Sequence, residues 1–457
     1  MTGHNPITLR RIASALALAL LLSGCMMAAP SNGPVPSGPP LPPMRIFGQA
    51  TPEPAARSNY DMAQDFVDLS FRLESGREME GFSRFEGPVT VRMIGSVPPT
   101  AAHDLSATLA RLRAEAGVEV TSTTTHNASI TIEFIPRKTM QARAPNAACF
   151  VAPRVSSWSE YRRARGDRLD WTTYQTRTAA AVFIPSDVAP QEVRDCLNEE
   201  LAQALGPLND LFRLPDSVFN DDNIHTVLTG FDMLMLRATY SPQLMPGMSK
   251  AEVSARLPAI LAAANPSGEH PGYPLQPTPR DFKDAIERAL GAHGNQGSRI
   301  AAAQQALAIA QPWQDHRTGF AWLTLGRIAG RDDPETSFAA FSNAAGLFNA
   351  ERLPIYAAHA NLQLAGFALA TGDTAKAIAL VDTSLPAAIR SQNASLMAGL
   401  MMVKATALDR LGQADAAASL RLDSLGWARY GMASDADVRR RLQSIAALAA
   451  PTEKTAP

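Results

Sequence analysis

The sequence predicts two folded parts, a mixed α+β domain followed by an all-α domain of helical hairpins. Between residues 59 and 264, short segments that alternate apolar and polar side chains are interspersed with amphipathic helices, as in half-buried strands and surface helices. From residue 280 to residue 449 the pattern is helical throughout and rich in Ala and Leu. The chain has 457 residues, 46% of them hydrophobic, which is enough for more than one packed core.

The N-terminus has the pattern of an export signal. Two arginines precede an apolar stretch, Ile12–Leu22, that is too short for a good membrane span and runs into Leu-Ser-Gly-Cys. This tetrapeptide resembles the bacterial lipobox, which implies lipidation of Cys25, and we expect residues 1–25 to be a lipoprotein signal peptide. The alternative is an ordinary secretory signal. By analogy with bacterial lipoproteins, Met26 in place of Asp favours an outer-membrane anchor facing the periplasm.

Three segments outside the domains are expected to lack a core of their own. Residues 26–58 are rich in Pro, Gly and Ser and predict a disordered tether between the lipid anchor and the folded body. Residues 265–279 predict an interdomain linker, and residues 450–457 a disordered tail. The formal net charge of the chain is -1, so charge gives no reason to expect a nucleic-acid partner.

Hydrophobic periodicity predicts the elements of the α+β domain (residues 59–264) in order. They are a helix at Tyr60–Leu73, a strand at Val89–Met93, a helix that contains Leu105, Leu109 and Leu112 and ends near Gly117, strands at Val118–Ser122, Ile130–Phe134, Cys149–Pro153 and Ala179–Pro185, and helices at Val193–Gly206 and Leu228–Tyr240. In the penultimate helix, apolar residues spaced by four mark the buried face. In the last helix, Thr229 and Asp232 form a variant of the capping box.

Two cysteines remain after Cys25, namely Cys149 and Cys196. Export leads to an oxidising compartment, so we expect a disulfide between them. The alternative is a pair of buried free thiols.

Turn signals recur through the helical domain (residues 280–449). They lie near Gly297, Gly330, Gly372 and Gly412, and the last three are about 40 residues apart. This recurrence predicts stacked helical hairpins, each covering the apolar face of its neighbour. The alternative is a generic helical bundle.

One segment of the helical domain resembles the start of a tetratricopeptide repeat. Trp322, Leu325 and Gly326 keep the W-x-x-L-G spacing of that family. The segment departs from the family pattern at Ile328, near which a Tyr is usual, and the period exceeds the family's roughly 34 residues. The resemblance implies a tetratricopeptide-like domain that binds a periplasmic protein or peptide.

Residues 194–210, RDCLNEELAQALGPLND, resemble the zinc-binding helix of the metzincin proteases, which carries H-E-x-x-H-x-x-G-x-x-H/D. Aligned on the glycine, Glu200 falls on the catalytic glutamate, and Glu199, Gln203 and Asn209 fall on the three zinc ligands. Phe219 stands where the family has the methionine of its Met-turn. The order of elements upstream also follows that family, so the resemblance implies a zincin-like (metzincin-like) fold. An unrelated α+β domain with surface acids is the alternative.

The departures from the metzincin motif matter for chemistry. All three imidazoles are absent, and amide oxygens are weak ligands for Zn²⁺, which prefers nitrogen and sulfur. We therefore expect no cofactor, with zinc as the alternative. A harder ion such as Ca²⁺ or Mg²⁺ could accept Glu199, Glu200 and Asp210. Cys196 would be a thiolate ligand only without the disulfide, and His225 is interpreted as structural.

A second resemblance covers residues 66–248 and brings no activity with it. The segment resembles a family of secreted Gram-negative lipoproteins classed only as a domain of unknown function. The stretches that carry this likeness are CLNEELAQALGPLNDL, LPDSVFNDDN, LTGFDMLMLR and PQLMPGMS.

These observations favour a binding or scaffold role in the cell envelope over catalysis. We expect a lipoprotein held on the outer membrane by Cys25, with a non-catalytic zincin-like domain and a helical domain that binds a periplasmic protein or peptide. The first alternative is a metal-dependent peptidase or other hydrolase that uses Glu200 as general base. The second is a purely structural envelope protein without a saturable partner.

Overall fold

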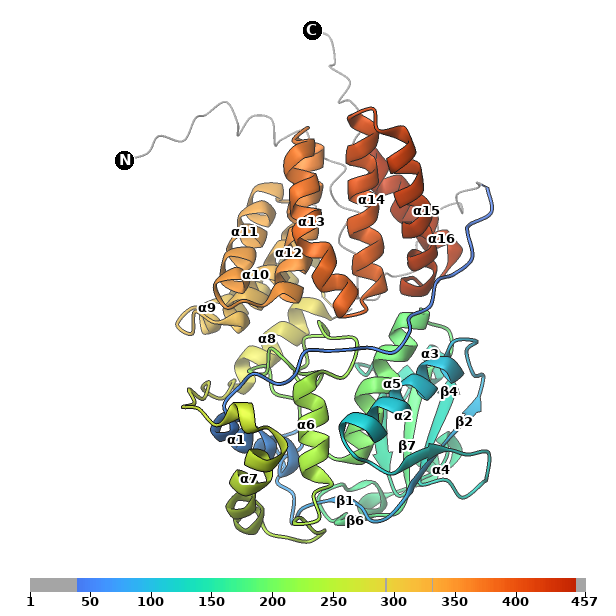
Figure 1. Ribbon diagram of the computed structural model, residues 1–457, viewed down its shortest axis with the longest axis vertical. Coiled ribbons are helices and arrows are strands. Elements are labelled where there is room, and N and C mark those ends of the chain that lie inside the picture. The colour runs from blue at the N-terminus through green and yellow to red at the C-terminus, as the bar shows by residue number, and fades with distance from the viewer. Residues whose placement is uncertain (1–38, 292–293, 331, 449–457) are drawn as a thin grey trace. The chain divides into compact units, whose positions relative to one another are not determined.

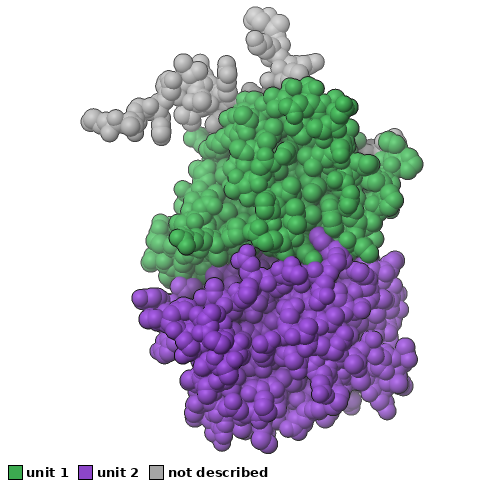
Figure 2. All heavy atoms as spheres, viewed as in Figure 1, with its two compact units in different colours: residues 1–46, 278–457 green, residues 47–277 purple. Residues whose placement is uncertain are grey.

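The computed structural model describes residues 39–291, 294–330 and 332–448. The predicted signal peptide (residues 1–25), the lipidation site Cys25 and the predicted tail (residues 450–457) lie outside this part of the chain. The structure divides into two compact units (Figure 2). Residues 47–277 form an α+β unit, and residues from 278 onward form a helical unit together with the segment that ends at residue 46.

A five-stranded sheet forms the centre of the α+β unit (Figure 1). Its strands are β2 (Val89–Gly95), β3 (Val120–Ser122), β4 (Ile130–Ile135), β5 (Phe150–Pro153) and β7 (Ala180–Pro185). The spatial order is β3-β2-β4-β7-β5, in which the first four strands are parallel and β5 is antiparallel to β7. The mixed α+β architecture expected from the sequence is confirmed.

Both faces of the sheet are covered, which explains why every residue of β7 is buried. Val182 and Ile184 face the larger core, formed with helices α2 (Ala101–Glu115) and α5 (Pro190–Leu205). On the other face, Phe183 packs with the short helices that follow β4 and β5. These are α3 (Arg137–Gln141) and α4 (Trp158–Arg163).

Three further helices complete the α+β unit. They are α1 (Asn59–Ser70), α6 (Gly230–Thr239) and α7 (Lys250–Ala264), and α7 packs against the other two. The predicted capping box at Thr229 and Asp232 is present at the start of α6. Two elements not expected from the sequence, β1 (Arg84–Phe85) and β6 (Thr176–Arg177), pair in parallel as a separate two-stranded sheet.

Residues 39–58, which we name the N-terminal strap, are packed on the protein instead of forming part of the disordered tether predicted for residues 26–58. In the helical unit, the N–H of Arg45 donates to the carbonyl of Gly426 at 3.0 Å, and Arg429 Nη1 donates to the carbonyl of Pro42 at 2.9 Å. The prolines hold this stretch extended, and its exposed carbonyls can accept such bonds. A segment whose composition cannot build a core of its own is therefore held in place by contacts with the folded surface.

The second half of the strap packs within the α+β unit. The ring of Phe47 lies 4.6 Å from the guanidinium of Arg194 on α5, and the Phe47 carbonyl is 2.8 Å from Nε2 of His103 on α2. Further along, the strap lies against the start of α6, where a Cβ on Gly230 would come within 2.2 Å of the carbonyl oxygen of Glu53. Glycine at this position is needed for that close approach.

The helical unit is a series of antiparallel hairpins (Figure 1). Its helices are α8 (Arg280–Leu290), α9 (Gln296–Ala310), α10 (His316–Ala329), α11 (Pro334–Ala350), α12 (Pro354–Ala370), α13 (Thr374–Arg390), α14 (Ala394–Arg410), α15 (Ala414–Gly431) and α16 (Asp435–Leu448). Helices α10, α12 and α14 begin 38 and 40 residues apart, so the expected helical repeats are confirmed. None of the helices in the described residues combines the length and the apolar character needed to cross a membrane.

The predicted disulfide between Cys149 and Cys196 is present. It links the residue before β5 to the middle of α5 and closes a loop with a sequence separation of 47. Cys196 is therefore not available as a thiolate ligand. The covalent bond joins the edge strand of the sheet to the helix that carries Glu199 and Glu200.

Replacing both Cys149 and Cys196 with serine is expected to lower the free energy of unfolding of the α+β unit by about 4 kcal/mol, because a loop of this length no longer restricts the unfolded chain. Urea unfolding of the full chain measures the loss, and hydrogen exchange locates it. Amides of β5 and α5 should lose protection while those of α12 and α14 keep theirs. Equal losses in both units, or none, would contradict this prediction.

Candidate functional site

Helix α5 presents the buried face that its sequence predicts. Its four apolar residues spaced by four are fully buried against the sheet and α2. Pro190 occupies the first turn, where a missing N–H is tolerated. Away from this face, Glu199 is partly buried, whereas Glu200 is only 5% exposed. The helix therefore carries one of its two consecutive glutamates into the interior.

The end of α5 is held by a buried arginine from β6. Arg177 is 2% exposed, and its guanidinium donates to the carbonyls of Gln203 at 2.8 Å, Ala204 at 2.7 Å and Gly206 at 2.7 Å. These carbonyls are the unpaired acceptors at the negative end of the helix dipole. Burial lowers the pKa of Arg177 to about 10, and the group remains a cation at neutral pH.

The chain leaves α5 through a close approach to α6. A Cβ on Gly206 would lie 3.1 Å from Cγ2 and 3.2 Å from Oγ1 of Thr239, so the small residue makes room for α6. Asn209 follows, and its Nδ2 donates to the carbonyl of Asp68 at 2.9 Å, in the last turn of α1. Asn209 falls on the third zinc-ligand position of the metzincin motif, and the structure directs its side chain to α1.

Three carboxyl groups from different segments meet beside the exit of α5. Glu74 follows α1, Asp210 follows α5, and Asp221 lies in the loop before α6. One oxygen atom of each lies within 4.8 Å of the other two. Asp210 is 1% exposed, and its Oδ2 accepts a hydrogen bond of 3.1 Å from Nε2 of Gln203. We name Glu74, Asp210 and Asp221, together with Glu199 and Glu200, the acidic cluster.

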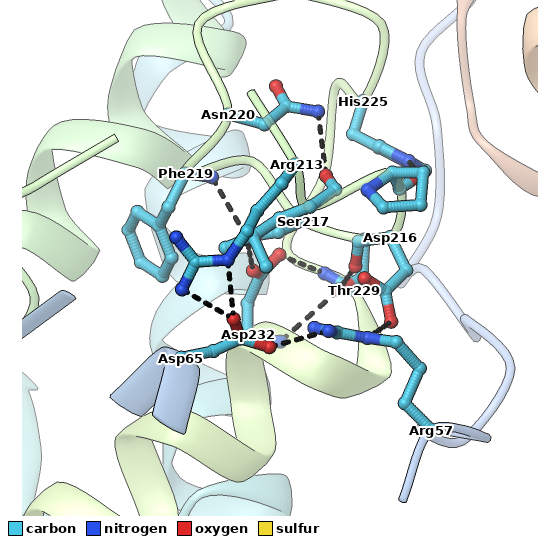
Figure 3. Close-up of polar contacts among 12 residues, drawn as sticks. Arg57, Asp65, Arg213, Asp216, Ser217, Phe219, Asn220, His225, Thr229 and Asp232 are labelled. Carbon is cyan, nitrogen blue, oxygen red and sulfur yellow. Dashed lines mark hydrogen bonds and ion pairs between the residues drawn. The ribbon is translucent and has the colours of Figure 1, made fainter. Parts of the chain in front are cut away.

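Asp232 orders the loop that carries Asp221 (Figure 3). Its carboxylate accepts hydrogen bonds from the Ser217 hydroxyl at 2.6 Å, the Val218 N–H at 3.2 Å and the Thr229 N–H at 2.7 Å. The Ser217 hydroxyl oxygen accepts from the N–H of Phe219 at 2.9 Å. Phe219, at the Met-turn position, is fully buried in the larger core. The loop is therefore anchored at its centre and at the start of α6.

A second set of ion pairs fixes the start of this loop to α1 and the strap (Figure 3). Arg57 contacts Asp65 through Nη1 at 2.5 Å and Asp216 through Nε at 2.9 Å, with its guanidinium 4.4 Å from the ring of Phe231. Arg213 donates to the other oxygen of Asp65 at 3.1 and 2.8 Å. Charges of opposite sign are therefore paired at the start of this loop.

The tip of the loop, residues 220–223, has an unusual backbone. Asp221 and Asn223 have φ angles of 63° and 57°, in the left-handed region. Asp and Asn tolerate this conformation better than most residues. Between them, the N–H of Asp222 donates to Oδ1 of Asn220 at 3.1 Å. The sequence Asn-Asp-Asp-Asn therefore suits the bend that brings Asp221 toward Asp210.

Burial and nearby negative charges raise the pKa values of Glu199, Glu200 and Asp210. For Glu200, burial first and the charge of Glu74 second raise the pKa to about 8. Burial, followed by the charge of Glu200, raises the pKa of Glu199. Burial, followed by the charge of Glu74, raises the pKa of Asp210. Oε2 of Glu200 is buried and has no hydrogen-bond partner among the described residues.

The structure brings together some of the residues that the sequence singled out and not others. Glu199, Glu200 and Gln203 lie at the acidic cluster, whereas Asn209 does not, and Asp210 takes the place beside Gln203. His225 is 2.9 Å from the carbonyl of Pro215 through Nε2, which is consistent with a structural role.

Two members of the acidic cluster, Glu74 and Asp221, were not found from the sequence. Each lies in a turn, far along the chain from α5 and without motif spacing to it. The Asn-Asp-Asp-Asn segment, with two consecutive acids in a turn, could have drawn attention to Asp221 as a candidate site residue. For Glu74 we find no comparable signal.

In the presence of a chelator, the protein is expected to lose stability as the pH rises from about 4.5 toward 8. The folded state raises the pKa of Glu200 to about 8, so it binds this proton more tightly than the unfolded chain does. Stability is therefore greatest below the ordinary pKa and declines as the proton is lost. The Glu200→Gln variant should show a weaker decline in melting temperature, whereas Glu119→Gln, which removes an exposed acid, should match the parent. Identical pH profiles for all three proteins would refute this assignment.

The Arg177→Lys variant is expected to lower the free energy of unfolding by about 2–4 kcal/mol, because an ammonium cannot donate to three carbonyls in the fork geometry of a guanidinium. Chemical denaturation measures the change. Arg72→Lys is the matched control, since Arg72 is exposed and forms a surface ion pair with Glu78. The control should change stability by less than about 0.5 kcal/mol. Equal effects of the two substitutions would show that the buried guanidinium is dispensable.

The segment that contains the acidic cluster is similar to one domain family. Residues 59–259 match the family described as "Protein of unknown function (DUF2927)". No curated protein and no solved structure matches the chain. The match runs from α1 into α7 and contains every member of the acidic cluster, while the helical unit lies outside it. The α+β unit is thus similar to an uncharacterised domain family, as its sequence led us to expect.

Proposed function

We propose that this protein is an envelope lipoprotein with a binding or scaffold role, in which a zincin-like domain has lost its zinc site. The Leu-Ser-Gly-Cys motif that ends at Cys25 supports lipid anchoring. Met26 after this cysteine supports placement on the outer membrane, facing the periplasm. The disulfide between Cys149 and Cys196 is consistent with an oxidising compartment of this kind.

The main support for the loss of the zinc site comes from the side chains at the three zinc-ligand positions, Glu199, Gln203 and Asn209. Asn209 is turned to α1 and donates to the Asp68 carbonyl. Gln203 donates its amide N–H to Asp210. Glu199 supplies the one carboxylate at the three ligand positions, and the charges that act on it are those of other acids. Zn²⁺ in catalytic sites is held by three ligands, usually with histidine among them. Side chains that are engaged in this way do not supply such a set.

The arrangement of elements supports the metzincin-like part of the proposal. From β2 to α5 the chain runs through strand, helix and further strands of one sheet before the helix that bears Glu199 and Glu200. The glycine exit and the buried residue at the Met-turn position, Phe219, are both retained.

The helical unit is proposed to bind a periplasmic protein or peptide through tetratricopeptide-like hairpins. The glycine of the W-x-x-L-G segment supports the resemblance, because a Cβ on Gly326 would lie 2.9 Å from the ring of Phe341 on α11. The close packing of α10 and α11 thus requires a small residue there. Helix α16 packs on α12, α14 and α15, so the partner would bind hairpin surfaces that α16 leaves exposed. A chain without any saturable partner would instead fit the structural alternative.

A second candidate function is a hydrolase that uses Glu200 as general base. The buried, unpartnered Oε2 of Glu200 and its pKa of about 8 favour it, since a base with a pKa near the working pH suits proton abstraction. The ligand positions described above argue against zinc as its metal.

Metal analysis and hydrolysis assays of the protein purified from the periplasm distinguish the two functions. We expect less than about a tenth of an equivalent of bound transition metal and no chelator-sensitive hydrolysis of peptides, because the imidazole ligands are missing. Glu200→Gln, the control for background activity, should leave any residual hydrolysis unchanged. Stoichiometric zinc that is lost in Glu199→Ala, with activity lost in Glu200→Gln, would establish the hydrolase.

A further inference from the structure

The first half of the N-terminal strap, residues 39–46, lies along helices α15 and α16 within the helical unit (Figure 1). Arg429 on α15 donates from Nη1 to the carbonyl of Pro42 at 2.9 Å. Arg439 on α16 donates from Nη2 to the carbonyl of Pro39 at 2.9 Å. Both acceptors are main-chain atoms, so the two arginines recognise the path of the strap and not the side chains of its residues.

The contacts of the strap recur at every third residue. Pro39 and Pro42 are followed at the same spacing by Arg45. The N–H of Arg45 donates to the carbonyl of Gly426 at 3.0 Å, and its guanidinium forms an ion pair with Asp423 on α15. Proline fixes φ at about −65° and favours extended backbone in the residue before it, which together cover the first five residues of the strap. A polyproline II helix has three residues per turn, so the strap presents one face of such a helix to α15 and α16.

Gly426 makes room for the strap on α15. A Cβ at this position would lie 3.0 Å from Cγ of Arg45 and 3.3 Å from the carbonyl oxygen of Pro43, and the next nearest atom, Cδ of Arg45, also belongs to the strap. Glycine weakens a helix interior relative to alanine. Helix α15 therefore carries a residue that is unfavourable for the helix itself and that fits an extended chain lying against it. This close fit is a second observation, separate from the hydrogen bonds, that points to a peptide at this face.

The first half of the strap has no buried side chain. Each residue from 39 to 46 is exposed or half-buried, and Ile46 is 49% exposed. The side chains of Arg45 and Asp423 are 51% and 45% exposed, and ion pairs this open to solvent contribute little to stability. Segments with few buried apolar contacts open locally at a low cost in free energy. A separate chain with the same chemistry can therefore exchange with the strap.

We propose that this face of α15 and α16 is a docking site for a proline-rich segment of a periplasmic partner protein, and that the strap is an internal ligand that competes for it. The site takes an extended chain in the polyproline II conformation. Arg429 and Arg439 bind two of its carbonyls, and Asp423 pairs with a basic residue three places after the second carbonyl. Such segments lose little conformational entropy on binding. The inference rests on the binding role proposed for the helical unit and names the chemistry of its partner.

Binding of a strap peptide to the full chain tests the proposal. The probe is a fluorescently labelled peptide of residues 39–46, and its anisotropy reports binding. The strap variant combines Pro39→Gly, Pro42→Gly and Arg45→Glu, which disfavour the extended conformation and reverse the charge that faces Asp423. We expect the strap variant to bind the peptide about tenfold or more tightly than the parent, because an attached strap competes at an effective concentration on the order of millimolar.

Two further changes show whether the peptide occupies the face described. Adding Gly426→Gln to the strap variant should abolish binding, because a side chain there takes the place of the peptide. Gly346→Gln is the matched control, since Gly346 is an exposed glycine of α11 with nothing within 4 Å of a Cβ, and it should leave binding unchanged. An Arg45→Glu peptide should bind the strap variant weakly and regain binding when Asp423→Arg is added to the protein.

Four results would overturn the proposal. They are no saturable binding to the strap variant up to about 1 mM peptide, equal binding by parent and strap variant, binding that Gly426→Gln leaves undiminished, and a dimer of the parent that the strap variant loses. The last result would assign the site to the strap of a second copy. If Gly426→Gln does not fold, the charge reversal at Asp423 decides, because this side chain is 45% exposed. None of these results refutes the binding role of the helical unit, which fails only if pull-down with the full chain finds no saturable partner.

Discussion

The position of the acidic cluster depends on the guanidinium of Arg177 at the end of α5. A buried cation is costly unless its donors are paired, and Arg177 makes four hydrogen bonds, three to carbonyls at the end of α5 and one to the Ser83 hydroxyl. Its charge is offset by the helix dipole and by the face of Trp171, 4.9 Å away. Because the bonds to these carbonyls hold the end of α5, they also position the segment after it, which contains Asp210. The two-residue strand β6, which pairs with β1, carries this side chain.

Most of the α+β fold could be predicted from periodicity, because strands and helices with one apolar face repeat at 2 and 3.6 residues. Strand β7 and the buried face of α5 are examples. The strap could not be predicted in this way. Its proline-rich composition correctly predicts that it cannot build a core of its own. It is instead held by distant residues: Arg429, which donates to the Pro42 carbonyl, is 387 residues further along the chain. Contacts with residues so far along the chain cannot be predicted from the composition of the strap itself.

The site was predicted in part, and the missed part has a physical reason. The motif on α5 identified Glu199, Glu200 and Gln203 because a helix fixes neighbours at three and four residues. Asn209 and Asp210 lie beyond the helix, where successive side chains point in different directions. Asp210 contacts Gln203, whereas Asn209 contacts α1. Glu74 and Asp221 enter through turns whose geometry depends on the completed fold. Spacing within a motif therefore predicts well which side chains lie together on a helix, and predicts poorly which side chains on loops join them.

The strap has a consequence for any attempt to dissect the protein into pieces. A fragment that starts at Asn59, where the family match begins, lacks Arg57 and leaves Asp65 and Asp216 with one counter-ion fewer. It also uncovers the surface around Gly230 that Glu53 occupies. A helical fragment without residues 39–46 loses the hydrogen bond from the N–H of Arg45 to the Gly426 carbonyl. The boundaries of a sequence family are thus narrower than the boundaries of the folded unit, and recombinant fragments should be cut by contacts instead of by homology.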